Sequence, residues 1–431
     1  MTAPPSSPQS SAALTRRTLL RAGVASLAAS GAVRAAEPTT LTVAAFPLVD
    51  EILRAALPQW QAQHPGVEVQ VISRQYADHH TAMTTALSTS TLLPDVMALE
   101  ASYLGRFAPG LGLQDLAALP FDITRQRERF VRYAYDQAVN PRGAVVAVPT
   151  DIGPGTLLYR HDILARAGVD EAELTRSWDA YIDAGERIKA RTGVRLIGSA
   201  QMLKDILIRK DIGPGEGLYF DRDSRVLVNS PRFVRAFELA RRVRRAQLDS
   251  RASTWTNDWA EGFKRGTVAT ELSGAWMVGQ LANWVAPATR GLWRAAQLPE
   301  QTFVSYGGTF YAMPRRADPA RKRLAWDLMQ WMTLRRETQL AAFKAQDAFP
   351  ALLEAHEDAF FDEPLPFLGG QPARRLWRES ARRIQSVAIH KQNEFAQEVL
   401  NAELDNVMDR DKPIAQALAD AEALLARRAR R

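Results

Sequence analysis

The chain has 431 residues, with 55 basic and 48 acidic side chains, and it contains no cysteine. The missing cysteine excludes disulfide bonds, a thiol nucleophile and a cysteine-linked lipid anchor. A chain of this length exceeds what one hydrophobic core usually serves, so two domains are expected. The basic runs follow helical patterns as solvated faces, and they do not predict nucleic-acid binding.

Residues 1–36 have the layout of an export signal. They contain an apolar stretch, no acidic residue and four arginines, namely Arg16, Arg17, Arg21 and Arg34. The adjacent arginine pair before Leu19 and Leu20 is typical of a twin-arginine signal, and the apolar stretch is too short to span a bilayer. Removing these four of the 55 basic residues leaves 51 against 48 acidic ones, a net charge of +3. We therefore predict a soluble protein exported to the periplasm.

Apolar runs alternate with helical patterns at the start of the mature chain. The runs predict strands at 41–46, 67–72 and 94–99, and the patterns between them predict helices at 52–60 and 81–90. This alternation predicts a parallel sheet covered on both faces. Ligands of such sheets bind beyond the carboxyl ends of the strands, which points here to Phe46, Gln75 and Glu100.

The pentapeptide DIGPG occurs twice, at 151–155 and at 211–215. The first copy lies between strand-like runs, whereas the second follows a helical pattern, so an internal repeat is excluded. Neither copy has the residues of a phosphate-binding loop. The second copy is predicted to be a surface turn in which Asp211 bonds its own backbone.

Two further helices are marked by their first residues. Ser177 is placed to cap a helix that begins with Trp178, and Pro413 precedes an apolar stripe at 414–425. The second of these helices is expected to pack on a domain at the C-terminus.

The segment Val148–Gly168, which reads VPTDIGPGTLLYRHDILARAG, resembles a segment of extracellular solute-binding proteins, family 1, of bacterial carbohydrate ABC transporters. Other segments agree with the family in the same order along the chain: His64–Gly66, Pro94–Val96, Trp178, Phe263–Gly266, Ser273–Trp276, Tyr306–Gly308 and Phe349–Pro350. The resemblance covers essentially the whole mature chain. Thr270, Glu271 and Ala275 depart from the family pattern.

The resemblance implies an α/β fold of the two-lobe periplasmic binding protein type (type II-like), with parallel-type sheets flanked by helices and a hinge between the lobes. The N-terminal lobe would hold 37–149 plus 308–383, and the C-terminal lobe 150–307 plus 384–431. The first DIGPG copy then lies just past a crossover strand, where it is predicted to be a ligand loop, with a plain hinge turn as the alternative.

A sugar offers apolar faces, which aromatic rings match, and a rim of hydroxyls, which carboxylates and amides bind. Trp276 matches the family's Gly-x-Trp position and is the principal aromatic prediction, although it could instead be a core tryptophan. Asp151 and Glu100 are the predicted polar anchors, with helix caps or surface acids as the alternative. The complete predicted ligand-binding set is Phe46, Gln75, Glu100, Asp151, Trp255, Trp276, Tyr306 and Gly308.

The implied function is capture of a carbohydrate by a monomeric periplasmic component of an ABC importer, which delivers it to two membrane permease subunits. No enzyme activity, cofactor or metal is predicted. His79-His80 is expected to be an exposed helix start, not a metal site. One alternative is a binding protein for a phosphorylated or anionic polyol or sugar. A less favoured one is an exported carbohydrate-active enzyme.

Overall fold

The computed structural model describes residues 39–107, 112–213 and 215–429, and the predicted export signal at 1–36 lies outside the described residues. The strands are β1 (Thr39–Ala45), β2 (Val67–Ser73), β3 (Val96–Glu100), β4 (Val148–Arg160), β5 (Thr270–Gly274), β6 (Trp293–Ala296) and β7 (Ser305–Ala312). Among the described residues, no helix is long and apolar enough to cross a membrane.

The helices before β5 are α1 (Val49–Gln61), α2 (Tyr76–Thr89), α3 (Ala101–Phe107), α4 (Arg132–Gln137), α5 (His161–Ala167), α6 (Glu171–Arg176), α7 (Trp178–Thr192), α8 (Ala200–Leu207), α9 (Pro231–Arg245) and α10 (Asn257–Lys264). Those after it are α11 (Met277–Gln280), α12 (Pro319–Thr333), α13 (Arg336–Gln346), α14 (Ala373–Arg383), α15 (Asn393–Asp409) and α16 (Ile414–Ala429). Short 3₁₀ and π segments, η1 to η7, connect several of these elements. The three strands and two helices predicted at the start of the mature chain are confirmed as β1 to β3 and α1 to α2, with shifts at their ends.

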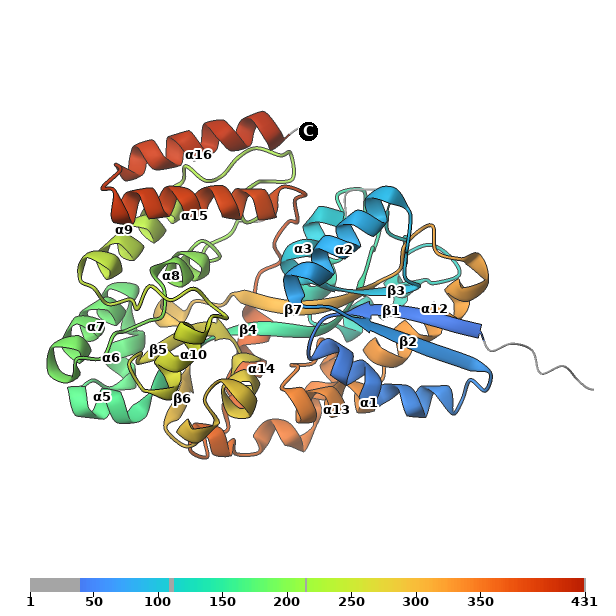
Figure 1. Cartoon of the computed structure of the whole chain (residues 1–431), viewed down its shortest axis with the longest axis horizontal. Coiled ribbons are helices and arrows are strands. Elements are labelled where there is room, and N and C mark those ends of the chain that lie inside the picture. Colours follow the sequence, from blue (N-terminus) through green and yellow to red (C-terminus); the bar gives the residue numbers. More distant parts are fainter. Residues whose placement is uncertain (1–38, 108–111, 214, 430–431) are drawn as a thin grey trace, which may run out of the picture. The chain divides into compact units, whose positions relative to one another are not determined.

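The strands form one mixed sheet in the order β2-β1-β3-β7-β4-β5, and β6 pairs with β4 (Figure 1). The predicted parallel arrangement holds for β1 with β2 and for β1 with β3. Every pair that involves β7 or β4 is antiparallel. The sequence did not reveal β7 as a partner of β3, because the two strands are distant in the chain.

Two hydrophobic clusters form the cores, and the strands β4 and β7 contribute to both. Val148 of β4 belongs to the first cluster and Leu157 to the second. In β7, Phe310 belongs to the first cluster, whereas Tyr306 packs against the second. The two strands lie side by side along their length (Figure 1). They therefore connect the two cores, which is the role expected of hinge strands.

The first DIGPG copy is part of a strand, so the predictions of a loop or a turn at these residues are wrong, whereas contact with a ligand there stays a prediction. Residues 151–155 lie inside β4, which pairs with β7 through two irregularities in register. A Cβ on Gly153 would stand 1.9 Å from the carbonyl oxygen of Tyr306, so only glycine permits this close approach of the two strands. In β7, Gly307 and Gly308 have φ of 86° and 124°, a backbone conformation that favours glycine.

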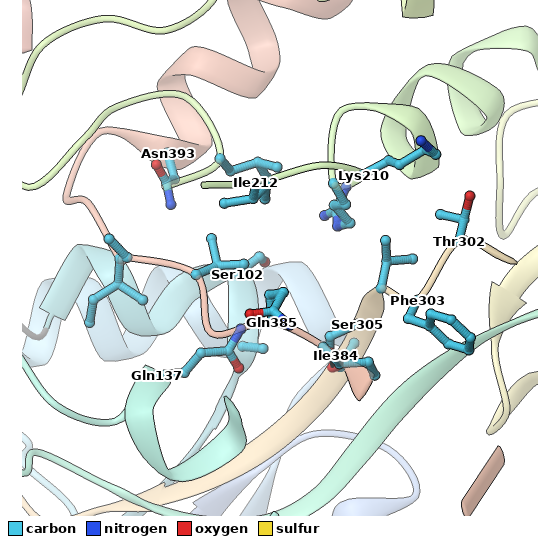
Figure 2. Close-up of a pocket in the computed structure, with 18 of the residues that line it drawn as sticks. Ser102, Gln137, Lys210, Ile212, Thr302, Phe303, Ser305, Ile384, Gln385 and Asn393 are labelled. Atoms are coloured by element: carbon cyan, nitrogen blue, oxygen red, sulfur yellow. Dashed lines mark hydrogen bonds between the residues drawn. The ribbon is translucent and has the colours of Figure 1, made fainter. Parts of the chain in front are cut away.

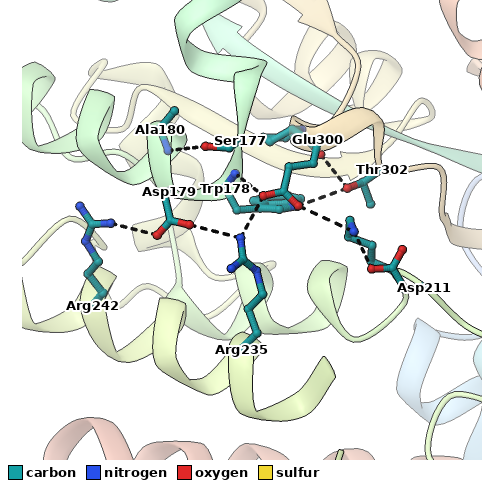
Figure 3. A network of polar contacts seen from close by, with 11 residues as sticks. Ser177, Trp178, Asp179, Ala180, Asp211, Arg235, Arg242, Glu300 and Thr302 are labelled. Carbon is teal, nitrogen blue, oxygen red and sulfur yellow. Dashed lines mark hydrogen bonds and ion pairs between the residues drawn. The ribbon is translucent and has the colours of Figure 1, made fainter. Parts of the chain in front are cut away.

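A polar network fixes the predicted helix α7 to the segment that leads into β7 (Figure 3). The Ser177 hydroxyl accepts a hydrogen bond from the backbone N–H of Ala180, which confirms the predicted cap. The Trp178 indole N–H donates to the Thr302 hydroxyl over 3.2 Å, and Arg235 bridges to Glu300 over 2.9 Å. These contacts hold the residues just before β7 at the edge of a cavity.

Candidate functional site

The cavity has a volume of about 330 Å³ and lies beside the first residues of β7. Its walls come from the end of β3 with the start of α3, the segment after α8, the residues before and in β7, and the segment that leads into α15. Figure 2 shows Ser102, Lys210, Thr302 and Asn393 around it. The wall therefore combines segments that are far apart in the sequence.

Glu100 and Asp151, the two predicted polar anchors, lie in one row across the sheet. Thr309 of β7 pairs with Glu100 of β3 on one side and with Asp151 of β4 on the other. Side chains of directly paired residues share a face of a sheet, so both carboxylates belong to the same face. Glu100 lines the cavity, whereas Asp151 does not.

Burial raises the pKa of both carboxyl groups. It raises the pKa of Asp151 to about 6, with hydrogen bonds from Thr309 opposing the shift and the charge of Glu100 adding to it. Glu100 accepts hydrogen bonds from the Tyr76 hydroxyl over 3.0 Å and from the Ser102 backbone N–H over 2.8 Å. Its pKa is raised by burial, although the Ser102 bonds limit the shift.

Phe46 and Gln75 do not line the cavity. Phe46 is buried and packs edge-on against Tyr76, with ring centroids 5.6 Å apart, so it supports the tyrosine that bonds to Glu100. Gln75 is exposed just before α2.

His79 and His80 are fully buried, and the prediction that they form an exposed helix start is wrong. They pack against Phe46, and the backbone N–H of Glu100 donates to Nε2 of His80 over 3.1 Å. Burial lowers the pKa of both rings, to about 3 for His80. The pair therefore packs as neutral imidazoles in the core behind Glu100. In residues 39–107, 112–213 and 215–429, no group of three or more His, Asp or Glu side chains could hold a metal ion.

Trp255 and Trp276 form an aromatic stack with Trp284, a residue that the sequence did not single out. The Trp255 ring lies 5.9 Å from that of Trp276 and 6.0 Å from that of Trp284, with interplanar angles of 19° and 17°. Trp255 is 53% exposed and Trp284 is 51% exposed, so broad ring area faces solvent. Ring faces exposed in this way are available for contact with a ligand.

Gly307 is the point at which the stack and the cavity meet. It lines the cavity, and a Cβ placed on it would stand 2.8 Å from Nε1 of Trp276. That indole N–H donates to the carbonyl oxygen of Tyr306 over 2.8 Å, which fixes the ring against β7. Trp255, Trp276 and Tyr306 do not line the cavity themselves.

Tyr306 and Gly308 belong to β7 between the two cores. The guanidinium of Arg209, a cavity-lining residue, lies 5.1 Å from the centre of the Tyr306 ring. Burial raises the pKa of the Tyr306 hydroxyl. A Cβ on Gly308 would stand 3.0 Å from the carbonyl oxygen of Asp151, so this glycine allows β7 to pass close to β4.

Several cavity residues were not found from the sequence. Arg209, Tyr219 and Glu394 all line the cavity, and they come from the segment after α8 and from the start of α15. No local motif marks them, because they come together only through the packing of α8 and α15. The assembled surface offers ring faces, hydrogen-bond donors and acceptors, which suits a solute with apolar faces and hydroxyl groups.

Comparison with known proteins gives a consistent result. The family model described as bacterial extracellular solute-binding protein matches residues 55–365. A lactose-binding protein of Rhizobium radiobacter is 25% identical over 346 residues, which cover 77% of this chain and 78% of the relative.

Two solved structures share the fold. A crystal structure of an extracellular solute-binding protein of family 1 superposes with a TM-score of 0.78 at 22% identity, covering 91% of this chain and 100% of the other. The ABC transporter associated binding protein of B. animalis subsp. lactis, in complex with β-1,6-galactobiose, has a TM-score of 0.74 at 21% identity and covers 91% and 98%.

Proposed function

Because the chain belongs to the bacterial extracellular solute-binding protein family, we propose that it captures a carbohydrate for an ABC importer and delivers it to the membrane permease. The lactose-binding relative, similar over most of both chains, supports a sugar as the solute. A neutral sugar in that relative favours a neutral carbohydrate here over the phosphorylated or anionic compound considered as an alternative. A periplasmic location, action as a monomer and the absence of enzyme activity complete the proposal.

The stack of Trp255, Trp276 and Trp284 beside a polar cavity is the observation that carries this proposal. Pyranose rings present C–H faces that pack on indole rings, and their hydroxyls need donors and acceptors close by. The stack supplies the indole rings, and Glu100 in the cavity wall supplies a hydrogen-bond acceptor. We place the sugar across Gly307, with one face on the stack and its hydroxyls toward the cavity.

In this proposal, β4 and β7 act as hinge strands, which let ligand binding change the arrangement of the two lobes. We keep the lobe boundaries proposed from the sequence, 37–149 plus 308–383 and 150–307 plus 384–431. A ligand that contacts both lobes favours the closed form, and the permease reads the closed form. Gly153, Gly307 and Gly308 permit the strand crossing on which such a motion depends.

Calorimetric titration with lactose, β-1,6-galactobiose and maltose tests the proposal, with Trp276→Ala and Trp276→Phe compared with the unmodified protein. We expect saturable binding of at least one sugar. We expect Trp276→Ala to weaken it about tenfold or more, because stacking on the indole face is lost, and Trp276→Phe to retain part of the affinity. Unchanged affinity in Trp276→Ala would remove the stack from the site.

A further inference from the structure

Two polar atoms in the cavity wall are buried without a hydrogen-bond partner among the described residues. They are the hydroxyl of Tyr219 and Oδ1 of Asn393. Tyr219 is 1% exposed, so its hydroxyl cannot turn to bulk water. A buried polar atom left unpaired costs free energy, and such atoms are rare in native proteins. Of the unpartnered buried side-chain atoms in the described residues, these two are the ones that belong to cavity-lining residues, where a ligand could supply a partner.

The surroundings of these atoms are polar and carry charge of both signs. The charges of Arg209 and Glu394, which both line the cavity, act on the Tyr219 hydroxyl, whose pKa is raised mainly by burial. Arg209 forms no ion pair within the described residues and donates to the backbone carbonyl of Asp205. The hydroxyl therefore feels the charges of two of the charged residues that line the cavity, besides that of Asp205.

The cavity also brings together two carboxyl groups that are far apart in the sequence. Glu394 of α15 and Glu100 of β3 both line it, and both interact with Ser102. Burial raises the pKa of Glu394, and the charge of Glu100 adds to that shift. Together with Asn393 Oδ1, these groups make a wall rich in acceptors. The hydroxyl groups of a sugar can donate to these acceptors and can accept from the Arg209 guanidinium, which also lines the cavity.

Building on the proposed function, we propose that Tyr219 and Asn393 form a second recognition point, which hydrogen-bonds the hydroxyls of one sugar unit inside the cavity. The tryptophan stack then holds the neighbouring unit on the other side of Gly307. The cavity volume of about 330 Å³ is at the small end of ligand pockets, about 300 to 1,000 Å³, so it suits one or two units and not a long chain. The protein therefore selects short oligosaccharides that reach both places.

The test compares Tyr219→Phe and Asn393→Ala with Tyr135→Phe. Tyr135 is a matched control because its hydroxyl is also buried without a partner among the described residues, yet it does not line the cavity. Calorimetry with lactose, β-1,6-galactobiose and maltose gives the affinities, and thermal melts of the ligand-free variants give stability.

We expect Tyr219→Phe and Asn393→Ala each to weaken the best-bound sugar about three- to tenfold, the effect of one lost hydrogen bond. Tyr135→Phe leaves affinity unchanged. The Tm of Tyr219→Phe stays equal to or above that of the unmodified protein, because the removed hydroxyl has no partner among the described residues.

The outcomes separate this inference from the function on which it rests. If the unmodified protein binds none of the three sugars, the proposed function fails and the inference fails with it. If it binds a sugar in a Trp276-dependent manner while both cavity variants bind equally well, the inference alone is overturned. The inference is also overturned if Tyr219→Phe and Tyr135→Phe weaken binding equally, or if lost affinity accompanies a lower Tm, because each result indicates indirect packing.

Discussion

Glu271 is a buried carboxyl group without a hydrogen bond or ion pair to any described residue. It lies in β5 opposite Leu158 of β4 and is 2% exposed. Burial alone raises its pKa to about 8. The residue is also one of the positions that depart from the family pattern. We predict that Glu271→Gln makes the protein more stable than the unmodified form at alkaline pH.

The sign follows from proton linkage. Because the pKa of Glu271 is higher in the folded chain than in the unfolded chain, the folded chain binds more protons, and stability falls as pH rises from about 4.5 to about 8. Each rise of one pH unit in this window lowers the free energy of unfolding by about 1.4 kcal/mol. Between pH 6.5 and pH 8.5 the loss amounts to about 2 kcal/mol, since ionisation in the folded state takes over near pH 8.

Urea unfolding monitored by circular dichroism at pH 6.5, 7.5 and 8.5 measures this effect. Burial also raises the pKa of Asp151, Asp347, Glu100 and Glu394, but these groups are present in both proteins, so their contributions cancel in the difference between them. We expect the free energy of unfolding of Glu271→Gln minus that of the unmodified protein to grow by about 2 kcal/mol across the range. A difference that stays constant with pH would refute the reasoning, because it would mean that Glu271 is already ionised when folded.

Two further predictions concern the hinge strands. Gly153→Ala should destabilise the protein by about 3 kcal/mol or more in urea unfolding, because its Cβ would overlap the Tyr306 carbonyl oxygen at 1.9 Å. Gly198→Ala, whose Cβ would lie 3.4 Å from Cδ1 of Trp259, should cost less than about 1 kcal/mol, and equal losses in the two variants would argue against the close crossing. Asp151→Asn should flatten the fall in stability between pH 4 and pH 6 by about 2 kcal/mol, a value reduced for the partial exposure of the side chain. A pH profile identical to that of the unmodified protein would show that Asp151 keeps an ordinary pKa.

Local patterns predicted the elements whose stabilising contacts are local. The sequence predicted β1, β2, β3, the Ser177 cap and the final helix α16. Hydrophobic periodicity and helix caps can be recognised within short segments. The first DIGPG copy was misassigned for the opposite reason. Gly-Pro-Gly favours a turn, but pairing with β7 keeps the segment extended, with one register irregularity just before it and one within it.

The candidate site was predictable in part. Strand ends indicated Glu100 and Asp151, which share a row on one face, and the family resemblance indicated Trp276, which lies in the stack. Tyr219 and Asn393 carried no signal in the sequence, because their significance depends on a hydroxyl and an amide oxygen left without partners after folding. The buried position of His79 and His80 likewise depends on packing against Phe46.

Thermal melts against neutral mono- and oligosaccharides, polyols and sugar phosphates test the central claim most directly. A ligand at about 100 times its Kd adds about 2.7 kcal/mol to the stability of the folded state, a shift readable as a higher Tm. The account predicts a higher Tm with one class of neutral short oligosaccharide and no shift with sugar phosphates. A shift with phosphorylated compounds alone, or no shift with any compound, would contradict it.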